Sequence, residues 1–485
     1  MPPCRFSDLP IDTMLEVMQH LAISDLVHLL LTCSSIYSLS QERSFWISLL
    51  ETTRAVCPIG CPKYAELSQY DLQNLKDLVA SRFKLQTNWN RSFPEVVDLH
   101  LTSLDERVDI VCLVQGTDIV LLHMRETGHV VCWDSKLAAP FPFQPIKTGG
   151  QLNDVSAPSE STHGVCSFVV LAKGDTSRRT VWRYIITIKH ENRKATGFES
   201  VCTEIADPIC HFESIFLTQD VVGAVIVEEL GDHCTITTSK VGDGAGGKES
   251  VNHMKLNYPI SERHLMVAFT YKGHLYNILE DGVTAQIQHI SRKNLTSGRC
   301  DEPSSVYKAD ILNVGETSFP LYYILPSCAS YGVAAAFVRI IDDDDEAGDG
   351  SVPAITFTFL PTTRVGDDSD DSDVSSPLTF PLPCPTARVP GRLTSPSLLW
   401  MDHGGFNIVA ILDDIDSNNT DILPTLVLVR YHPSTQSTSV HYPGISPSLD
   451  LYAVTNVCVD DTAGVVYLTG VVEESKWSLC TLSYV

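Results

Sequence analysis

The feature of this sequence that most constrains its fold is a change in hydrophobic periodicity near residue 95. Before it, apolar residues recur every three to four positions, which is the spacing of amphipathic helices. Beyond Val96, short runs rich in Val, Ile, Leu, Tyr and Thr are separated by Gly, Pro, Asp and Ser, a pattern of strands and turns. The chain of 485 residues also exceeds what one hydrophobic core usually holds. We therefore expect a small helical part followed by a large all-β domain.

Three short helices are expected within the first fifty residues. Pro10 suits the first turn of a helix that continues to Leu21, because a proline there loses no hydrogen bond. Ser24 is a good N-cap for a second helix that reaches Tyr37, and a third begins near Ser40. So small a unit buries too little surface to cover all of its own apolar faces. The pattern predicts that a partner protein covers them.

The order and spacing of the residues in this segment resemble the F-box family. The landmarks are the pairs Leu9-Pro10, Asp25-Leu26 and Phe45-Trp46. The resemblance implies that residues 5–52 form three small helices that insert into the C-terminal helices of a Skp-type adaptor and so join a cullin-RING ubiquitin ligase. The alternative is an ordinary amphipathic helical cap on a larger domain.

The resemblance also implies roles for individual residues, none of them catalytic. The residues expected to bind the adaptor are Leu9, Pro10, Leu15, Met18, Leu21, Leu26, Leu29, Leu30 and Cys33. Those expected to pack the F-box helices together are Tyr37, Phe45 and Trp46.

Residues 53–94 are expected to form a connector with one helix. A turn-rich stretch, Cys57–Pro62, precedes a helical pattern that includes Leu72 and Phe83. Cys57 and Cys61 could be drawn as zinc ligands, but no second Cys or His pair follows at ligand spacing and a structural zinc site needs four ligands. We expect no metal and no cofactor.

Seven units of adjacent strands can be recognised in residues 95–485. They are Gly116–Asp134, Gly164–Ile188, Val221–Thr238, His264–Ile290, Gly332–Leu360, Gly405–Tyr431 and Gly464–Tyr484. The first, which ends in Trp133-Asp134, resembles a propeller blade. Radial sheets bury both faces, and the terminal run Trp477–Val485 can close the ring against Val96–Leu101. The expected fold is a seven-bladed β-propeller; a two-sheet sandwich is the competing architecture.

Two acidic stretches interrupt the strand pattern, near residues 341–350 and 365–390. Runs of like charge repel one another and stay solvated, so we expect disordered loops. The alternative is a docking tract for a basic partner, or phosphorylation at Ser369 and Ser372 that deepens the charge.

Charge and composition limit the partners of the chain. A net charge of −25 opposes binding to a phosphate backbone, so no nucleic-acid partner is expected. No run approaches the length of apolar sequence that crosses a bilayer, so no membrane association is expected. Fifteen scattered cysteines lack the spacing of a disulfide framework and are expected to be reduced, in the cytoplasm or the nucleus.

Three stretches invite a catalytic or ligand-binding interpretation, and each lacks a necessary part. Gly242–Lys248 has the spacing of a phosphate-binding loop, but Glu249 replaces the hydroxyl residue that should meet magnesium. His233 and Cys234 are adjacent on a strand and therefore point to opposite faces. The acidic stretch Asp413–Asp416 lacks the Gly and the terminal Glu of a calcium loop. We expect a non-enzymatic protein.

The function expected from this combination is that of a substrate receptor in an SCF-type (Skp–cullin–F-box) ubiquitin ligase. The helices would bind the adaptor, the β domain would bind a client protein of unknown identity, and the recruited enzyme would transfer ubiquitin. Two alternatives remain: a scaffold that acts independently of the ligase, and a propeller enzyme regulated through its F-box, which would need converging titratable residues.

Overall fold

The computed structural model describes most of the chain from Leu9 to Val485. The gaps in this description are residues 20, 22, 33, 150, 162–163, 174–180, 192, 206–209, 219–220, 229–233, 242–251, 257–264, 272–273, 281–283, 298–304, 311–321, 327–332, 342–353, 362–383, 391–392, 403, 416–421, 447–448 and 474–475. The glycine-rich stretch 242–248, the two phosphorylation candidates and most of both acidic inserts lie outside the described residues.

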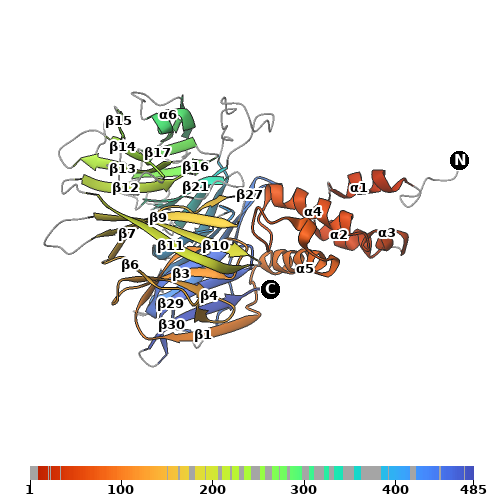
Figure 1. Ribbon diagram of the computed structural model, residues 1–485. Coiled ribbons are helices and arrows are strands. Elements are labelled where there is room, and N and C mark those ends of the chain that lie inside the picture. The colour runs from red at the N-terminus through yellow and green to blue at the C-terminus, as the bar shows by residue number, and fades with distance from the viewer. Residues whose placement is uncertain are drawn as a thin grey trace, which may run out of the picture.

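The helical part projects from one side of the β domain (Figure 1). Its helices are α1 (Ile11–Gln19), α2 (Ile23–Leu30), α3 (Ser34–Leu39), α4 (Arg43–Val56) and α5 (Leu72–Trp89), with a 3-10 turn at Leu67–Gln69. The α5 helix begins after Asp71, whose carboxylate accepts a hydrogen bond from the Asn74 N–H at 2.7 Å. This is a favourable N-cap, because it satisfies a backbone donor that has no partner within the helix.

The second expected helix is in fact two helices, α2 and α3. The Leu31 and Thr32 N–H groups bond three residues back, to the carbonyl oxygens of His28 and Leu29. The Thr32 hydroxyl also donates to the Leu29 carbonyl at 2.7 Å. A side chain that competes for backbone groups in this way favours a helix end.

The apolar faces of these helices are largely covered by the chain itself. Met14, Leu26 and Leu50 share one interior cluster with Leu75 and Val79 of α5. The expectation that only a partner protein could cover these faces is therefore wrong, because α5 and the connector add enough apolar surface to form a helical core.

The β domain is built from antiparallel sheets of four or five strands. One sheet has the spatial order β1 (Asp98–Leu104), β30 (Lys476–Ser483), β29 (Val465–Glu473) and β28 (Val454–Asp460). The next has the order β2 (Val108–Leu113), β3 (Ile119–Met124), β4 (His129–Asp134) and β5 (Ala139–Pro140), with β6 (Ile146–Lys147) beside β4. A third has the order β7 (Gln151–Val155), β9 (Val165–Lys173), β10 (Val181–Glu191) and β11 (Lys194–Ile205), with β8 (Ser159–Ser161) beside β9.

Four further sheets complete the set that the structure describes. They are β12 (Cys210–Leu217), β13 (Val221–Glu228), β14 (Cys234–Lys240) and β15 (Asn252–Leu256); β16 (Leu265–Tyr271), β17 (His274–Glu280), β18 (Thr284–Ile290) and β19 (Ser305–Asp310); β20 (Tyr322–Pro326), β21 (Val333–Ile341), β22 (Ala354–Pro361) and β23 (Thr386–Pro390); and β24 (Leu393–Met401), β25 (Asn407–Ile415), β26 (Ile422–His432) and β27 (Ser437–His441). A short helix, α6 (Arg292–Ser297), follows β18.

The sheets follow one another around a ring. Neighbouring sheets are in contact through the strand pairs β2 and β28, β28 and β24, β24 and β20, β20 and β16, β16 and β12, β12 and β9, and β11 and β4. Each of the seven strand units recognised in the sequence lies within a single sheet. This arrangement confirms a small helical N-terminal part joined to a large β-propeller.

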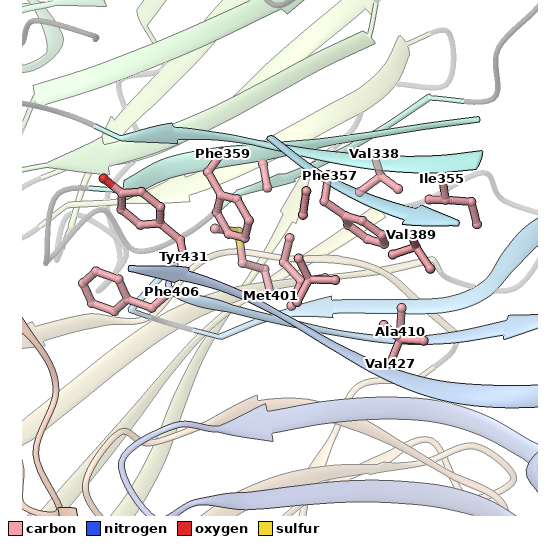
Figure 2. Close-up of a cluster of buried hydrophobic side chains, with 14 of the residues drawn as sticks. Val338, Ile355, Phe357, Phe359, Val389, Met401, Phe406, Ala410, Val427 and Tyr431 are labelled. Carbon is pink, nitrogen blue, oxygen red and sulfur yellow. The ribbon is translucent and has the colours of Figure 1, made fainter. Parts of the chain in front are cut away.

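The ring closes through the two ends of the β domain, as expected. β1 pairs with β30 along its whole length, from Asp98 opposite Ser483 to Leu104 opposite Trp477. Side chains then fill the spaces between sheets. Figure 2 shows one such cluster, in which Phe359 stacks on Tyr431 with ring centroids 5.6 Å apart.

The end of one expected disordered insert, residues 365–390, is an ordered strand. Its last residues form β23, which pairs with β22 and buries Ala387 and Val389. The like-charge argument does not extend to these residues, because the acidic run ends at Asp373. Separately, within the described part of the chain, no helix is both long and apolar enough to cross a bilayer.

Ring closure yields a stability prediction. Leu482 is buried on β30 opposite Leu99, so Leu482→Ala should lower the free energy of unfolding by about 2–4 kcal/mol through the lost burial and the cavity left behind. Val201→Ala, on the exposed face of β11, should change it by less than about 0.5 kcal/mol. Urea denaturation compares the two variants; equal midpoints would contradict the role given to the closing strand.

Candidate functional site

The candidate site is the helical part together with its junction with the sheets. The interior of this part is formed by Phe45 and Trp46 of α4, which contact each other edge to face at 5.0 Å. The Trp46 indole N–H donates to the Ser40 carbonyl at 2.8 Å, which ties the start of α4 to the end of α3. Buried in this way, both side chains hold the helices together.

The residues expected to bind an adaptor divide into two groups. Met18, Leu26 and Leu30 are buried in the interior cluster. With 6% or less of their surface exposed, these three side chains pack inside the helical part, where the expectation had placed them on the contact surface. The side chains of Leu15 and Cys33 lie outside the described residues.

The other expected contact residues are more accessible. Leu9, Leu21 and Leu29 are half-buried at the edge of the same cluster, and Pro10 is exposed. Tyr37, expected to pack the helices, is instead 52% exposed on α3. The helical spacing places it on the outer face, because Ile36 beside it is the residue that turns inward.

Two exposed apolar side chains were missed by sequence reasoning. Val17 of α1 is 40% exposed, and Leu31, just after α2, is 73% exposed. The sequence offers a weak indication at Leu31 only, since it follows the last helical turn and extends the apolar run Leu29-Leu30.

The connector between α4 and α5 lies across turns of several sheets. Gly116, in the turn between β2 and β3, has a φ of +71° and lies so close to Cys61 that an added methyl group would be 2.3 Å from the Cys61 carbonyl carbon. Its N–H donates to the Thr462 hydroxyl, in the turn between β28 and β29, at 3.1 Å. A methyl group at Gly404, after β24, would lie 3.3 Å from Pro58. A methyl group at Gly60 of the connector would lie 3.6 Å from the Thr462 carbonyl oxygen, so the connector approaches three sheets at once.

Arg193, in the turn between β10 and β11, contacts the connector from a fourth sheet. Its Nη1 donates to the Gly60 carbonyl and its Nη2 pairs with Asp118, both at 2.8 Å. Arg193 adopts a φ of +69°, which is unfavourable for a side chain with a Cβ. Such a conformation persists when the surrounding contacts determine it, as these two interactions do.

The α5 helix is fixed to the sheets at its C-terminal end. The buried Asn88 side chain donates to the carbonyl oxygens of Glu95, at 2.7 Å, and Tyr484, at 2.9 Å, and accepts from the Glu95 N–H at 2.9 Å. The Arg430 guanidinium lies 5.4 Å from the Trp89 ring centroid and donates to Asn90 at 2.7 Å. These contacts join the helical part to the closing sheet and to the sheet of β24–β27.

The two connector cysteines are poor candidates for metal binding. Burial raises the pKa of the Cys61 thiol to about 11, and burial also raises the pKa of Cys57. Within the described residues, no group of three or more His, Cys, Asp or Glu side chains could hold a metal ion.

Comparison with known proteins identifies the helical part. Residues 6–48 match the F-box domain family, so this chain carries an F-box domain at its N-terminus, followed by a β-propeller. No curated protein matches the chain.

Several solved structures resemble the propeller distantly. The WD40 domain of SCAP from fission yeast is 12% identical, with 79% of this chain and 82% of that chain covered and a TM-score of 0.36. Hsv2 from Kluyveromyces lactis is 10% identical, with 68% of this chain and 84% of that chain covered and a TM-score of 0.33. The Dos1 propeller is 7% identical, with 81% of this chain and 85% of that chain covered and a TM-score of 0.36. Because these TM-scores are low, the assignment of the propeller fold rests on the observed strand order.

The close approach at Gly116 can be tested against a matched glycine. Gly149 has a similar φ of +75° but open space around its Cβ position, so Gly149→Ala measures backbone strain alone. Gly116→Ala adds the clash with Cys61 and should lower the melting temperature clearly more than Gly149→Ala. It should also increase proteolytic cleavage within residues 57–62. Equal effects of the two variants would show that the connector does not depend on this contact.

The attachment of α5 yields a second prediction. Asn88→Ala should lower the free energy of unfolding by about 1–3 kcal/mol, because it removes three hydrogen bonds and leaves the buried carbonyl of Tyr484 without this partner. Asn74→Ala, on the exposed face of the same helix, should be neutral or slightly stabilising. Chemical denaturation measures both; a neutral Asn88→Ala would refute the proposed attachment.

Proposed function

We propose that this protein is the substrate receptor of an SCF-type ubiquitin ligase, working in the cytoplasm or nucleus. The observation that carries the proposal is the F-box domain match at residues 6–48, joined to a propeller. F-box domains in general connect a client-binding domain to the Skp-type adaptor of a cullin ligase. The chain would then supply proximity, and the recruited enzyme would supply the chemistry.

The exposed apolar residues of the helical part are the proposed adaptor contacts. They are Pro10, Val17, Leu31 and Tyr37, with the half-buried Leu9, Leu21 and Leu29 beside them. Transfer of such side chains from water into an interface is favourable by about 25 cal/mol per Å² of apolar area. The buried Met18, Leu26 and Leu30 would support this surface from beneath without touching the adaptor.

The client is proposed to bind at the ends of the sheets that face away from the helical part. The helices and connector contact the turns that join first and second strands, at Gly116, Gly404 and Gly464. In an antiparallel sheet the next turn lies at the opposite end. There, Arg107 stacks over the Trp477 ring at 5.6 Å, and arginine and tryptophan are common among residues that dominate protein interfaces.

Adaptor binding is tested by paired surface variants. Val17→Asp with Leu31→Asp should weaken binding of a purified Skp-type adaptor by at least about tenfold, because it places charges in an apolar interface. Leu137→Asp with Val201→Asp, on similarly exposed propeller sites, should leave the affinity unchanged. Both doubles should keep the wild-type melting temperature. Unchanged affinity in the helical double would refute the assignment of these contacts.

A second experiment separates a receptor from a ligase-independent scaffold. Proteins captured by wild type and by the helical double variant are compared by mass spectrometry, with and without proteasome inhibition. Ligase components should be lost from the variant while clients are retained, and clients should accumulate on inhibition only with the wild type. Retained clients with no such accumulation would favour the scaffold.

A further inference from the structure

Two buried carboxyl groups meet where the helical part joins the propeller. Asp402 follows β24 and is fully buried, and Asp461 lies in the turn after β28, with 2% of its surface exposed. Each of the two carboxyl groups lies close enough to influence the pKa of the other. They come from neighbouring sheets of the ring, so their interaction spans a sheet boundary.

The oxygens of the two carboxyl groups are unequally satisfied. Asp402 accepts the Phe406 N–H at 2.9 Å and the Asn407 side-chain amide at 2.5 Å. Asp461 Oδ2 has no hydrogen-bond partner among the described atoms and lies 3.0 Å from the position of a Cβ at Gly404. An ionised oxygen in that position would be costly, because a buried charge needs a partner.

The charged and titratable groups around the pair come from every element packed against it. Arg82 of α5 donates to the Asp461 carbonyl at 3.3 Å and also faces its carboxyl group. Arg430 of β26 and Asp460 of β28 complete the charged surroundings. The Cys57 thiol of the connector faces Arg82 and Asp461. The pair thus lies within the contact between helix, connector and sheets.

The surroundings favour retention of a proton. Burial raises the pKa of Asp402 to about 6 and, together with the neighbouring Asp402, raises the pKa of Asp461 well above its ordinary value; Arg82 opposes this second shift. Two carboxyl groups this close cannot both ionise without repulsion, so they titrate as a unit.

We propose that a proton shared by Asp402 and Asp461 fastens the helical part to the propeller, and that its loss loosens this junction. With the proton present, the two turns hold together beneath Pro58 and Arg82. Without it, two like charges face each other inside the contact and the connector separates more readily. The device is internal to this chain and operates whether or not an adaptor is bound.

The direction of the pH dependence follows from the raised pKa values. A carboxyl group protonated in the folded state but ionised in the unfolded state stabilises the fold at low pH. The stabilisation is complete below about pH 4, the ordinary range of an aspartate, and is lost as the pH rises through the folded pKa of the pair. The junction should therefore weaken as the pH rises from about 4 through the pKa of Asp402, which is about 6.

Hydrogen–deuterium exchange of the full chain tests the proposal. After correction for intrinsic exchange, the opening constant of the peptides that cover residues 57–62 and 78–89 should rise with pH, by up to about tenfold per unit for one proton. Peptides from β9, on another sheet, should show no such rise. A flat profile at the junction of the wild-type protein would overturn the proposal, whatever the variants do.

Substitutions assign the effect to the pair. Asp461→Asn removes one of the two titrating groups and supplies an amide that can donate to Asp402, so exchange at its junction should rise less steeply with pH than in the wild type. Asp105→Asn, which removes an exposed acid elsewhere, should retain the wild-type slope. A wild-type slope in Asp461→Asn would also overturn the proposal.

Discussion

The structure depends on how closely the connector approaches the turns of the propeller. At Gly116 the backbone of the β2–β3 turn touches the Cys61 carbonyl, and at Gly464 a Cβ would lie 2.4 Å from Leu85 of α5. Both glycines adopt positive φ angles, so glycine is favoured at each position for two reasons: the conformation of the turn and the lack of space for a Cβ. Together with the hydrogen bonds of Asn88 and Arg193, these two approaches position the helical part on the sheets.

Ring closure and attachment of the helices involve the same sheet. β30 closes the ring against β1 and ends beside Tyr484, whose carbonyl accepts a hydrogen bond from Asn88 of α5. The turn of this sheet at Asp461 and Thr462 also meets Arg82 and Gly116. Opening of this sheet would therefore remove part of the attachment of α5, while the contacts from Arg193 and Arg430 on other sheets would remain.

Local patterns made much of this fold predictable. The strand units were visible because alternating runs and glycine turns are short-range features, and the pairing of the two chain ends followed because a ring of sheets has to close. The packing of α5 on the earlier helices was not, since it depends on tertiary contacts, and it decides that Met18 is buried while Tyr37 is exposed. The Asp402–Asp461 pair joins turns far apart in sequence, so no sequence pattern indicates it.

Binding of a purified Skp-type adaptor to the full chain, followed by calorimetry at several temperatures, tests the central claim most directly. The account predicts a saturable one-to-one complex with a negative heat-capacity change, because apolar side chains of the F-box domain leave water on binding. Absence of binding at micromolar concentrations, or equal binding by a chain that lacks residues 1–50, would contradict it.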